Sequence, residues 1–268
     1  MGFKRLNFLL VCLGFLFVLS FLIPWAAPQN PLDINLDGRL MAPSANHLFG
    51  TDDLGRDVLS RVLQGFSTTV MVSLSALVSA LLIGIVLGGL AGYYYKRWVD
   101  AGFNWIVSLI MSIPFLLIMA SILSLTTPSI YKAYVILAAV MWVNTARLVR
   151  AEVIKRMPLD YVMASRALGS TEWNIMVKDI LPACTQSGVY FSITYLPEII
   201  ALEAGLSFLG LGVQPPAPGL GKMIFDGLNY IISAPWMALF PALSLFVLVF
   251  TINLIVKFRG GEYAKLIR

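Results

Sequence analysis

The sequence predicts an all-α membrane protein with six transmembrane helices and both termini in the cytoplasm. Of its 268 residues, 59% are hydrophobic and only 12% are charged, against roughly 25% charged in an ordinary soluble domain. Six long stretches lack charged residues altogether, and a transmembrane helix needs about 20 predominantly apolar residues. Six such helices leave enough chain for loops but too little for a sizeable soluble catalytic domain.

Four of the charge-free stretches are long enough to be read directly as spans: Leu6–Leu32, Val62–Tyr95, Ala101–Tyr131 and Gly227–Val256. The shorter stretch Ala133–Ala146 becomes a span if Arg147 and Arg150 lie at the interfacial end of the same helix and extend outward. The stretch Ile180–Pro197 is long enough for a span if its helix extends toward Leu202.

The first stretch has two interpretations. Lys4 and Arg5 precede its apolar core, and the small residues Ala26 and Ala27 follow it, as in a cleaved signal peptide. We favour an uncleaved first span, because the apolar core is long and Pro28 follows the candidate cleavage site.

The distribution of basic residues predicts the orientation of the spans. With the N-terminus inside, 14 of the 19 Lys and Arg residues fall on the inner side, and cytoplasmic loops are where such residues accumulate. The net charge of +5 therefore lies beside the apolar stretches and indicates a lipid bilayer rather than a nucleic acid as partner. The chain then divides into a first span with its outer loop (1–65), a core of five spans (66–257) and a cytoplasmic tail (258–268). Within the core, residues 205–234 are rich in Gly and Pro and are expected to form a second outer loop.

Small residues recur at every fourth position along the second span, at Ala76, Ala80, Gly84, Gly88 and Gly92. This spacing places them on one side of a helix, where another backbone can approach closely and gain van der Waals contact. Two partners for this small-residue strip remain open. One is another helix of the same chain, and the other is a helix of a partner membrane subunit.

The polar inner segment 147–182, between the fourth and fifth spans, contains the pattern of a short helix. Asp160 stands near its start and Gly169 just past its end, as helix termini favour. Ser170 is expected to cap a second helix, and Pro182 to mark a bend where the chain re-enters the membrane. The two helices form either a docking surface for a cytosolic partner or simply a folded loop. The residues that share one face of the first helix are Tyr161, Ala164, Ser165 and Leu168.

Three motifs resemble those of a known family. Residues 161–169 (YVMASRALG), followed by the Leu-Pro pair at 181–182, resemble the EAA loop of ABC-importer permeases. Residues 49–61 (FGTDDLGRDVLSR) and 203–216 (EAGLSFLGLGVQPP) resemble the C-type permease subunit of the dipeptide, oligopeptide and nickel branch. Met163 and Ser165 depart from the general EAA pattern, which has Glu and Ala at these positions.

The resemblance implies a type I ABC-importer permease fold with a cytoplasmic coupling helix in an EAA loop at 151–182. It implies a multi-pass protein of the plasma membrane, either a bacterial inner membrane or an archaeal cell membrane. The implied partners are a second homologous permease subunit, two cytosolic ATP-binding subunits and an extracytoplasmic solute-binding protein. ATP and magnesium bind to the ATPases in that family, so this chain is expected to hold no cofactor. The residues expected to couple to the ATPases are Asp160, Tyr161, Ala164, Ser165, Leu168, Gly169 and Pro182.

Polar residues on the outer side have both functional and structural interpretations. His47 with the nearby aspartates would suit a metal site, but the family resemblance makes Asp52, Arg56 and Asp57 a structural turn and ion-pair cluster, so no metal is expected. Glu203 lies near the outer end of the fifth span, where an ionisable group is a functional candidate. We expect it to act in an outer gate or to brace a loop, with direct substrate contact as the alternative.

The expected function is a non-catalytic permease subunit that forms half of a translocation pathway for small peptides. Residues 219–222 (GLGK) fail the spacing of a phosphate-binding loop, because Pro216 replaces its first glycine and Met223 its final Ser or Thr. Nickel or a metal chelate is the alternative substrate. A self-contained secondary carrier is a further alternative, but it needs coupling-ion groups near mid-membrane, which the nearly charge-free spans do not offer. An intramembrane enzyme or a structural scaffold is the last alternative.

Overall fold

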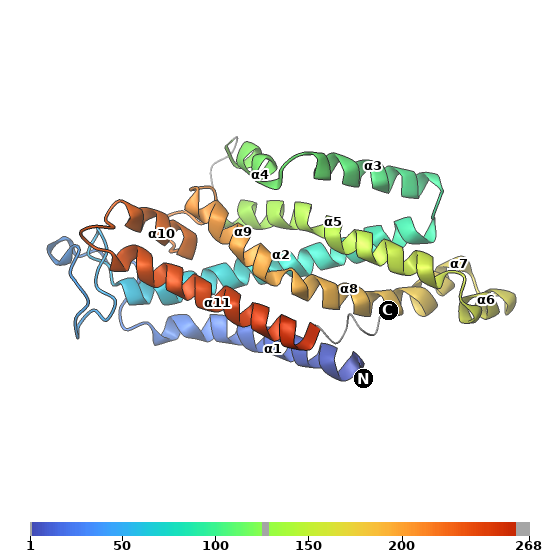
Figure 1. Ribbon diagram of the computed structural model, residues 1–268, viewed down its shortest axis with the longest axis horizontal. Helices are drawn as coiled ribbons and strands as arrows, with labels where there is room; N and C mark the ends of the chain where they lie inside the picture. The colour runs from blue at the N-terminus through green and yellow to red at the C-terminus, as the bar shows by residue number, and fades with distance from the viewer. Residues whose placement is uncertain (1, 125–128, 261–268) are drawn as a thin grey trace. The chain divides into compact units, whose positions relative to one another are not determined.

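The computed structural model describes residues 2–124 and 129–260, which form helices joined by turns and loops (Figure 1). Within these ranges the only β-type pairing is an isolated bridge between Thr51 and Asp57. The prediction of an all-helical chain is therefore confirmed for the described residues. Three described helices have the length and apolar composition of a membrane span: Val58–Tyr93, Tyr134–Arg156 and Trp236–Lys257.

A broken pair of helices, Glu172–Thr194 and Leu196–Phe208, makes a fourth span if the two are counted together. Three or four of the six predicted spans thus meet this criterion as the structure has them. The predicted third span is interrupted, and the interruption has a local physical cause.

The described residues divide into two compact units. Unit 1 is drawn from Met1–Ser75, Ala120–Val135 and Leu196–Arg268, and unit 2 from Ala76–Met119 and Ile136–Tyr195. The boundary between them falls within α2 (Val58–Tyr93), which contributes to both. Unit 2 also holds α3 (Trp98–Ser112) and most of α5 (Ile130–Arg156).

The predicted first span coincides with α1 (Gly2–Leu22), which continues into the short 3-10 helix η1 (Ile23–Ala26). The loop that follows contains a second 3-10 helix, η2 (Leu36–Gly38), and ends where α2 begins. Because α2 begins at Val58, the division predicted at residue 65 lies inside this helix. Of the predicted tail, residues 261–268 lie outside the described part of the chain.

The predicted third span is two helices rather than one. α3 ends at Ser112, and α4 (Phe115–Ser124) begins after a break. Ile113 is extended, with φ −107° and ψ 131°, because the ring of the following proline clashes with a helical residue before it. Residues 125–128 of this stretch lie outside the described residues.

The inner segment has its first helix where the sequence predicts it, in α6 (Asp160–Ala167). The second differs in two respects. Thr171 rather than Ser170 caps α7 (Glu172–Asn174). The chain then runs through a π-helix, η3 (Ile175–Ile180), directly into α8 (Leu181–Thr194).

The predicted bend at Pro182 is wrong, since the helix is continuous there and breaks at Tyr195. Proline has no N–H and disturbs an ordinary α-helical turn. The preceding turn is wider: the Leu181 N–H bonds the Met176 carbonyl, five residues back. This wider turn lets the helix pass the proline without ending.

The predicted second outer loop contains a helix that we did not expect, α10 (Leu220–Leu228), after α9 (Leu196–Phe208). Its buried residues Leu220, Met223 and Gly227 follow helical spacing, and the first two pack with Val58 and Val62 of α2 in the core of unit 1. The last helix, α11 (Trp236–Gly260), begins nine residues after the start of the charge-free stretch from Gly227.

Candidate functional site

α6 presents an exposed apolar face. Figure 1 shows α6 and α7 together at one end of α5 and α8. The Leu168 side chain at the end of α6 is 87% exposed and that of Tyr161 is 44% exposed, whereas Val162 between them is fully buried. The helix therefore has one side attached to unit 2 and another accessible.

Val162 joins α6 to the core of unit 2. It packs in a cluster with Tyr93 of α2, Val149 and Val153 of α5, and residues of η3 and α8: Ile175, Met176, Ile180 and Cys184. Close-packed apolar contacts transmit displacement because the interior has few voids. One apolar cluster thus joins α6 to α2, α5 and α8.

A polar contact closes the turn between α6 and α7. The carboxylate of Glu172 accepts hydrogen bonds from Nε and Nη2 of Arg166 at 3.1 and 3.2 Å, and another from the Tyr93 hydroxyl. The Thr171 hydroxyl accepts the Asn174 N–H at 3.3 Å. The roles of Tyr93 and Arg166 were missed in the sequence, because neither residue stands at a helical spacing from Glu172.

Gly169 ends α6 in the left-handed region, with φ +84°. The Gly169 N–H bonds the Arg166 carbonyl and the Ser170 N–H bonds the Ser165 carbonyl, both at 3.1 Å. These two bonds are those of a Schellman motif, in which glycine is favoured because it has no Cβ to clash. A Cβ at this position would meet nothing within 4 Å, so only the backbone conformation requires glycine here.

All five residues of the small-residue strip are buried, and its three glycines face α5. A Cβ on Gly84 would lie 2.8 Å from the Thr145 Cβ, one on Gly88 would meet the Ala146 carbonyl, and one on Gly92 would lie 2.8 Å from the Arg150 carbonyl oxygen. Of the two partners left open by the sequence, these contacts favour a helix of the same chain.

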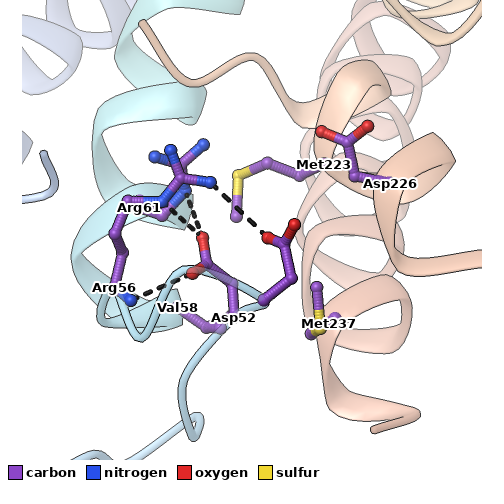
Figure 2. A pocket seen from close by; sticks show the side chains of 8 residues that line it. Asp52, Arg56, Val58, Arg61, Met223, Asp226 and Met237 are labelled. Atoms are coloured by element: carbon purple, nitrogen blue, oxygen red, sulfur yellow. Dashed lines mark hydrogen bonds and ion pairs between the residues drawn. The ribbon is translucent and has the colours of Figure 1, made fainter. Parts of the chain in front are cut away.

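In unit 1, two arginines converge on Asp52 in the turn that precedes α2 (Figure 2). Arg56 Nε lies 2.7 Å and Arg61 Nε 3.3 Å from Asp52 Oδ2, while Oδ1 accepts the N–H groups of Leu54 and Arg56 at 2.9 Å. Gly55 completes the turn with φ +73°. Arg61 was not assigned to this cluster from the sequence, since it lies nine residues from Asp52.

Asp57 belongs to a separate set of contacts in the same unit. Its Oδ2 accepts the Ser60 N–H at 2.8 Å and the Ser60 hydroxyl at 2.7 Å, and its Oδ1 lies 3.0 Å from Nδ1 of His47. Because α2 begins one residue later, Asp57 is its N-cap. The structure thus uses Asp57 to start α2 and Asp52 to hold the preceding turn.

We expect Asp57→Ala to lower the free energy of unfolding by about 1–2 kcal/mol, because it removes a helix cap whose partners are buried. Asp57→Asn keeps a side-chain oxygen that can accept the Ser60 N–H, and should retain most of that stability. Thermal unfolding of the two purified variants in detergent tests the expectation. Equal midpoints for Asp57→Ala and the unmodified chain would contradict it.

Glu203 is 1% exposed and lies inside unit 1. Its Oε1 accepts the Ser207 hydroxyl at 2.8 Å, and the same hydroxyl accepts the Val213 N–H at 3.1 Å. These bonds link α9 to the loop that follows it, in keeping with the loop-bracing interpretation. They do not join Glu203 to Asp52, Arg56 or Asp57.

The comparison with known families decides the identity of the chain. Residues 84–259 match the family described as binding-protein-dependent transport system inner membrane component. The chain belongs to this family. The match covers the inner segment, the three glycines of the strip and Glu203, whereas Asp52, Arg56 and Asp57 precede it.

The permease is also similar to curated proteins of bacteria. It is 34% identical over 251 residues to the dipeptide transport system permease protein DppC of Alkalihalophilus pseudofirmus, covering 92% of this chain and 82% of that protein. It is 35% identical over 248 residues to the protein of the same name in Bacillus subtilis, with coverage of 92% and 77%. It is 32% identical over 248 residues to the glutathione transport system permease protein GsiD of Pectobacterium atrosepticum, with coverage of 92% and 81%.

These matches confirm the resemblance to ABC-importer permeases and to their dipeptide and oligopeptide family. The permease is a multi-pass protein of the plasma membrane, and its relatives are transport proteins rather than enzymes.

Proposed function

We propose that this permease forms half of the translocation pathway of an ATP-driven importer of small peptides, and that α6 is the helix through which cytosolic ATPases move it. The other half of the pathway is a second, homologous permease. Two ATP-binding subunits bind ATP and magnesium, and an extracytoplasmic binding protein delivers the substrate. Peptide is preferred to nickel because the similar curated proteins are named for dipeptide and glutathione transport.

The topology that goes with this proposal has six spans and both termini in the cytoplasm. The first span and outer loop occupy 1–65, the core 66–257, with the EAA loop at 151–182, and the tail 258–268. In this arrangement α6 and α7 face the cytosol, where the ATPases are. The excess of Lys and Arg on the inner side supports the orientation.

The observation that carries the proposal is the combination of an exposed face and a buried anchor on one short helix. Leu168 and Tyr161 are accessible to a partner, while Val162 lies in the cluster shared with α2, α5 and η3. A rigid element of this kind transmits a rigid-body displacement from a bound partner to the packed spans. Gly169 and the contacts of Glu172 hold its orientation.

We expect Leu168→Glu to reduce retention of the ATPase subunits during purification about tenfold, because a charge in an apolar docking contact costs about 1.4 kcal/mol or more. Uptake of labelled dipeptide into liposomes containing the complete importer should fall in parallel. The substitution is at a side chain that is 87% exposed, so the permease itself should fold normally.

Met163→Glu is the matched control. Met163 is also exposed, and at 100° per residue it lies about 140° around α6 from Leu168. The substitution introduces the Glu that the general EAA pattern has at this position. It should leave ATPase retention and uptake unchanged. Full retention and uptake in Leu168→Glu would refute the coupling role of this face, and failure of the unmodified importer to take up peptide would refute the proposed substrate.

A further inference from the structure

Unit 2 contains an open cavity of about 470 Å³ between α3, α5 and α8. This volume lies within the roughly 300–1,000 Å³ range of small-molecule sites. Aromatic rings of Phe103 and Phe191 form part of the wall. The polar side chains that line it include Asn104, Asn144, Arg147, Arg150 and Tyr195.

One of the two arginines already has its counter-charge. Arg150 Nε and Nη2 lie 2.6 and 3.1 Å from the two carboxylate oxygens of Asp100, which also accept the Lys96 N–H and the Asn104 amide at 3.0 Å. Asp100 directly precedes the predicted third span, and its hydrogen bonds with Arg150 lower its pKa. Both charges of this pair persist at neutral pH, and the acceptor sites of Asp100 are occupied.

The other arginine, Arg147, lacks such a counter-charge among the described residues. Arg147 is exposed in the cavity, and its guanidinium contacts the Met111 sulfur at 3.4 Å. Sulfur is a weak acceptor. Among the described residues no carboxylate pairs with it. Arg147 stands toward the interfacial end of a helix that is long enough to span a membrane, where a long cationic side chain can extend toward the polar boundary.

We propose that this cavity is a subsite for the transported peptide and that Arg147 binds its C-terminal carboxylate. This inference rests on the proposed function. The guanidinium presents a planar fork of donors that matches a carboxylate in bidentate geometry. Every linear peptide carries that group whatever its side chains, so a site of this kind accepts peptides without reading their sequence.

The remaining lining fits a peptide rather than a bare anion. The Asn144 amide provides a donor and an acceptor for peptide groups, and the rings of Phe103 and Phe191 offer apolar contact to side chains of varied size. With Asp100 held by Arg150, the cavity keeps the net positive charge of Arg147.

The test uses the complete importer in liposomes and a labelled dipeptide in two forms, with a free or an amidated C-terminus. Arg147→Gln should lower uptake of the free acid about tenfold, the factor that corresponds to about 1.4 kcal/mol, and leave uptake of the amide nearly unchanged. The preference of the binding protein is the same for both permeases and cancels in the ratio. Arg147→Lys, which keeps the charge but not the fork, should give an intermediate ratio.

Lys155→Gln is the matched control, because it removes one charge from the same helix at an exposed side chain outside the cavity. It should leave both uptakes unchanged. An equal loss of free acid and amide in Arg147→Gln overturns the inference, whether it arises from disrupted assembly or from a lost contact with an anionic lipid. If the unmodified importer takes up neither form of the dipeptide, both the proposed function and this inference are overturned.

A binding measurement without the binding protein gives a second readout. The purified nucleotide-free importer should retain the free-acid dipeptide in equilibrium dialysis, and Arg147→Gln should abolish that retention. No retention by the unmodified importer, or equal retention by the variant, overturns the inference even if uptake of the amide is too slow to measure.

Discussion

Gly88→Ala is expected to lower the free energy of unfolding by about 3 kcal/mol, at the upper end of the cost of overfilling a packed interior. The added Cβ would meet the Ala146 carbonyl oxygen, and would lie 2.9 Å from the Ala146 Cα and carbonyl carbon. Backbone atoms cannot turn aside as a flexible side chain can, so α2 and α5 would have to separate. The alanine gains up to about 1 kcal/mol of helix propensity, which does not offset this cost.

Gly102→Ala provides the matched control, because Gly102 is also helical but a Cβ there meets nothing within 4 Å. It gains the same helix propensity without a clash and should be as stable as the unmodified chain or more so. The two variants are compared by thermal unfolding in detergent, followed by size-exclusion chromatography. Equal unfolding midpoints for the two variants would contradict the inference that α2 and α5 lie too close together to admit a Cβ at Gly88.

Gly169→Val is expected to reduce peptide-stimulated ATP hydrolysis by the complete importer about tenfold. The residue has φ +84°, a conformation that costs an ordinary L-residue roughly 1–2 kcal/mol, and a β-branched side chain tolerates it least. The strain is relieved by unwinding the end of α6, which moves Leu168 and its exposed face. Because a Cβ at this position would meet nothing within 4 Å, the effect is expected to come from the backbone conformation.

Gly169→Asn separates this cause from a simple loss of flexibility. Asparagine adopts the left-handed conformation more readily than other non-glycine residues, so this variant should keep most of the peptide-stimulated hydrolysis. The measurement is ATP hydrolysis by the reconstituted importer, with and without peptide and its binding protein. Equal activity of the Val and Asn variants would show that the turn at the end of α6 is not required for coupling.

Features defined by local spacing could be predicted from the sequence. The bounds of α6 follow from Asp160 near its start and Gly169 just past its end, and the structure agrees. The strip that contains Gly84 and Gly88 was assigned to a helix-packing face from its period alone, and both glycines meet α5. These predictions succeed because a helix places residues four apart on one side whatever surrounds it.

Features that depend on backbone details within an apolar stretch were not predicted. A charge-free run says nothing about where a helix breaks, so the break at Ile113 and the continuous helix through Pro182 both differed from expectation. α10 was read as loop because glycine and proline surround it. It is helical because Leu220 and Met223 are buried against α2.

The sequence by itself determined that this chain is helical, lies in a membrane and carries a short exposed helix on its polar inner segment, because composition and helical period act locally. Only the tertiary structure decided which charges are compensated. Arg147 and Arg150 are indistinguishable as neighbours on one helix, and Asp100, 50 residues away, neutralises the second of them. Contacts between residues so distant along the chain are set by how the helices pack, and sequence spacing carries no record of that packing.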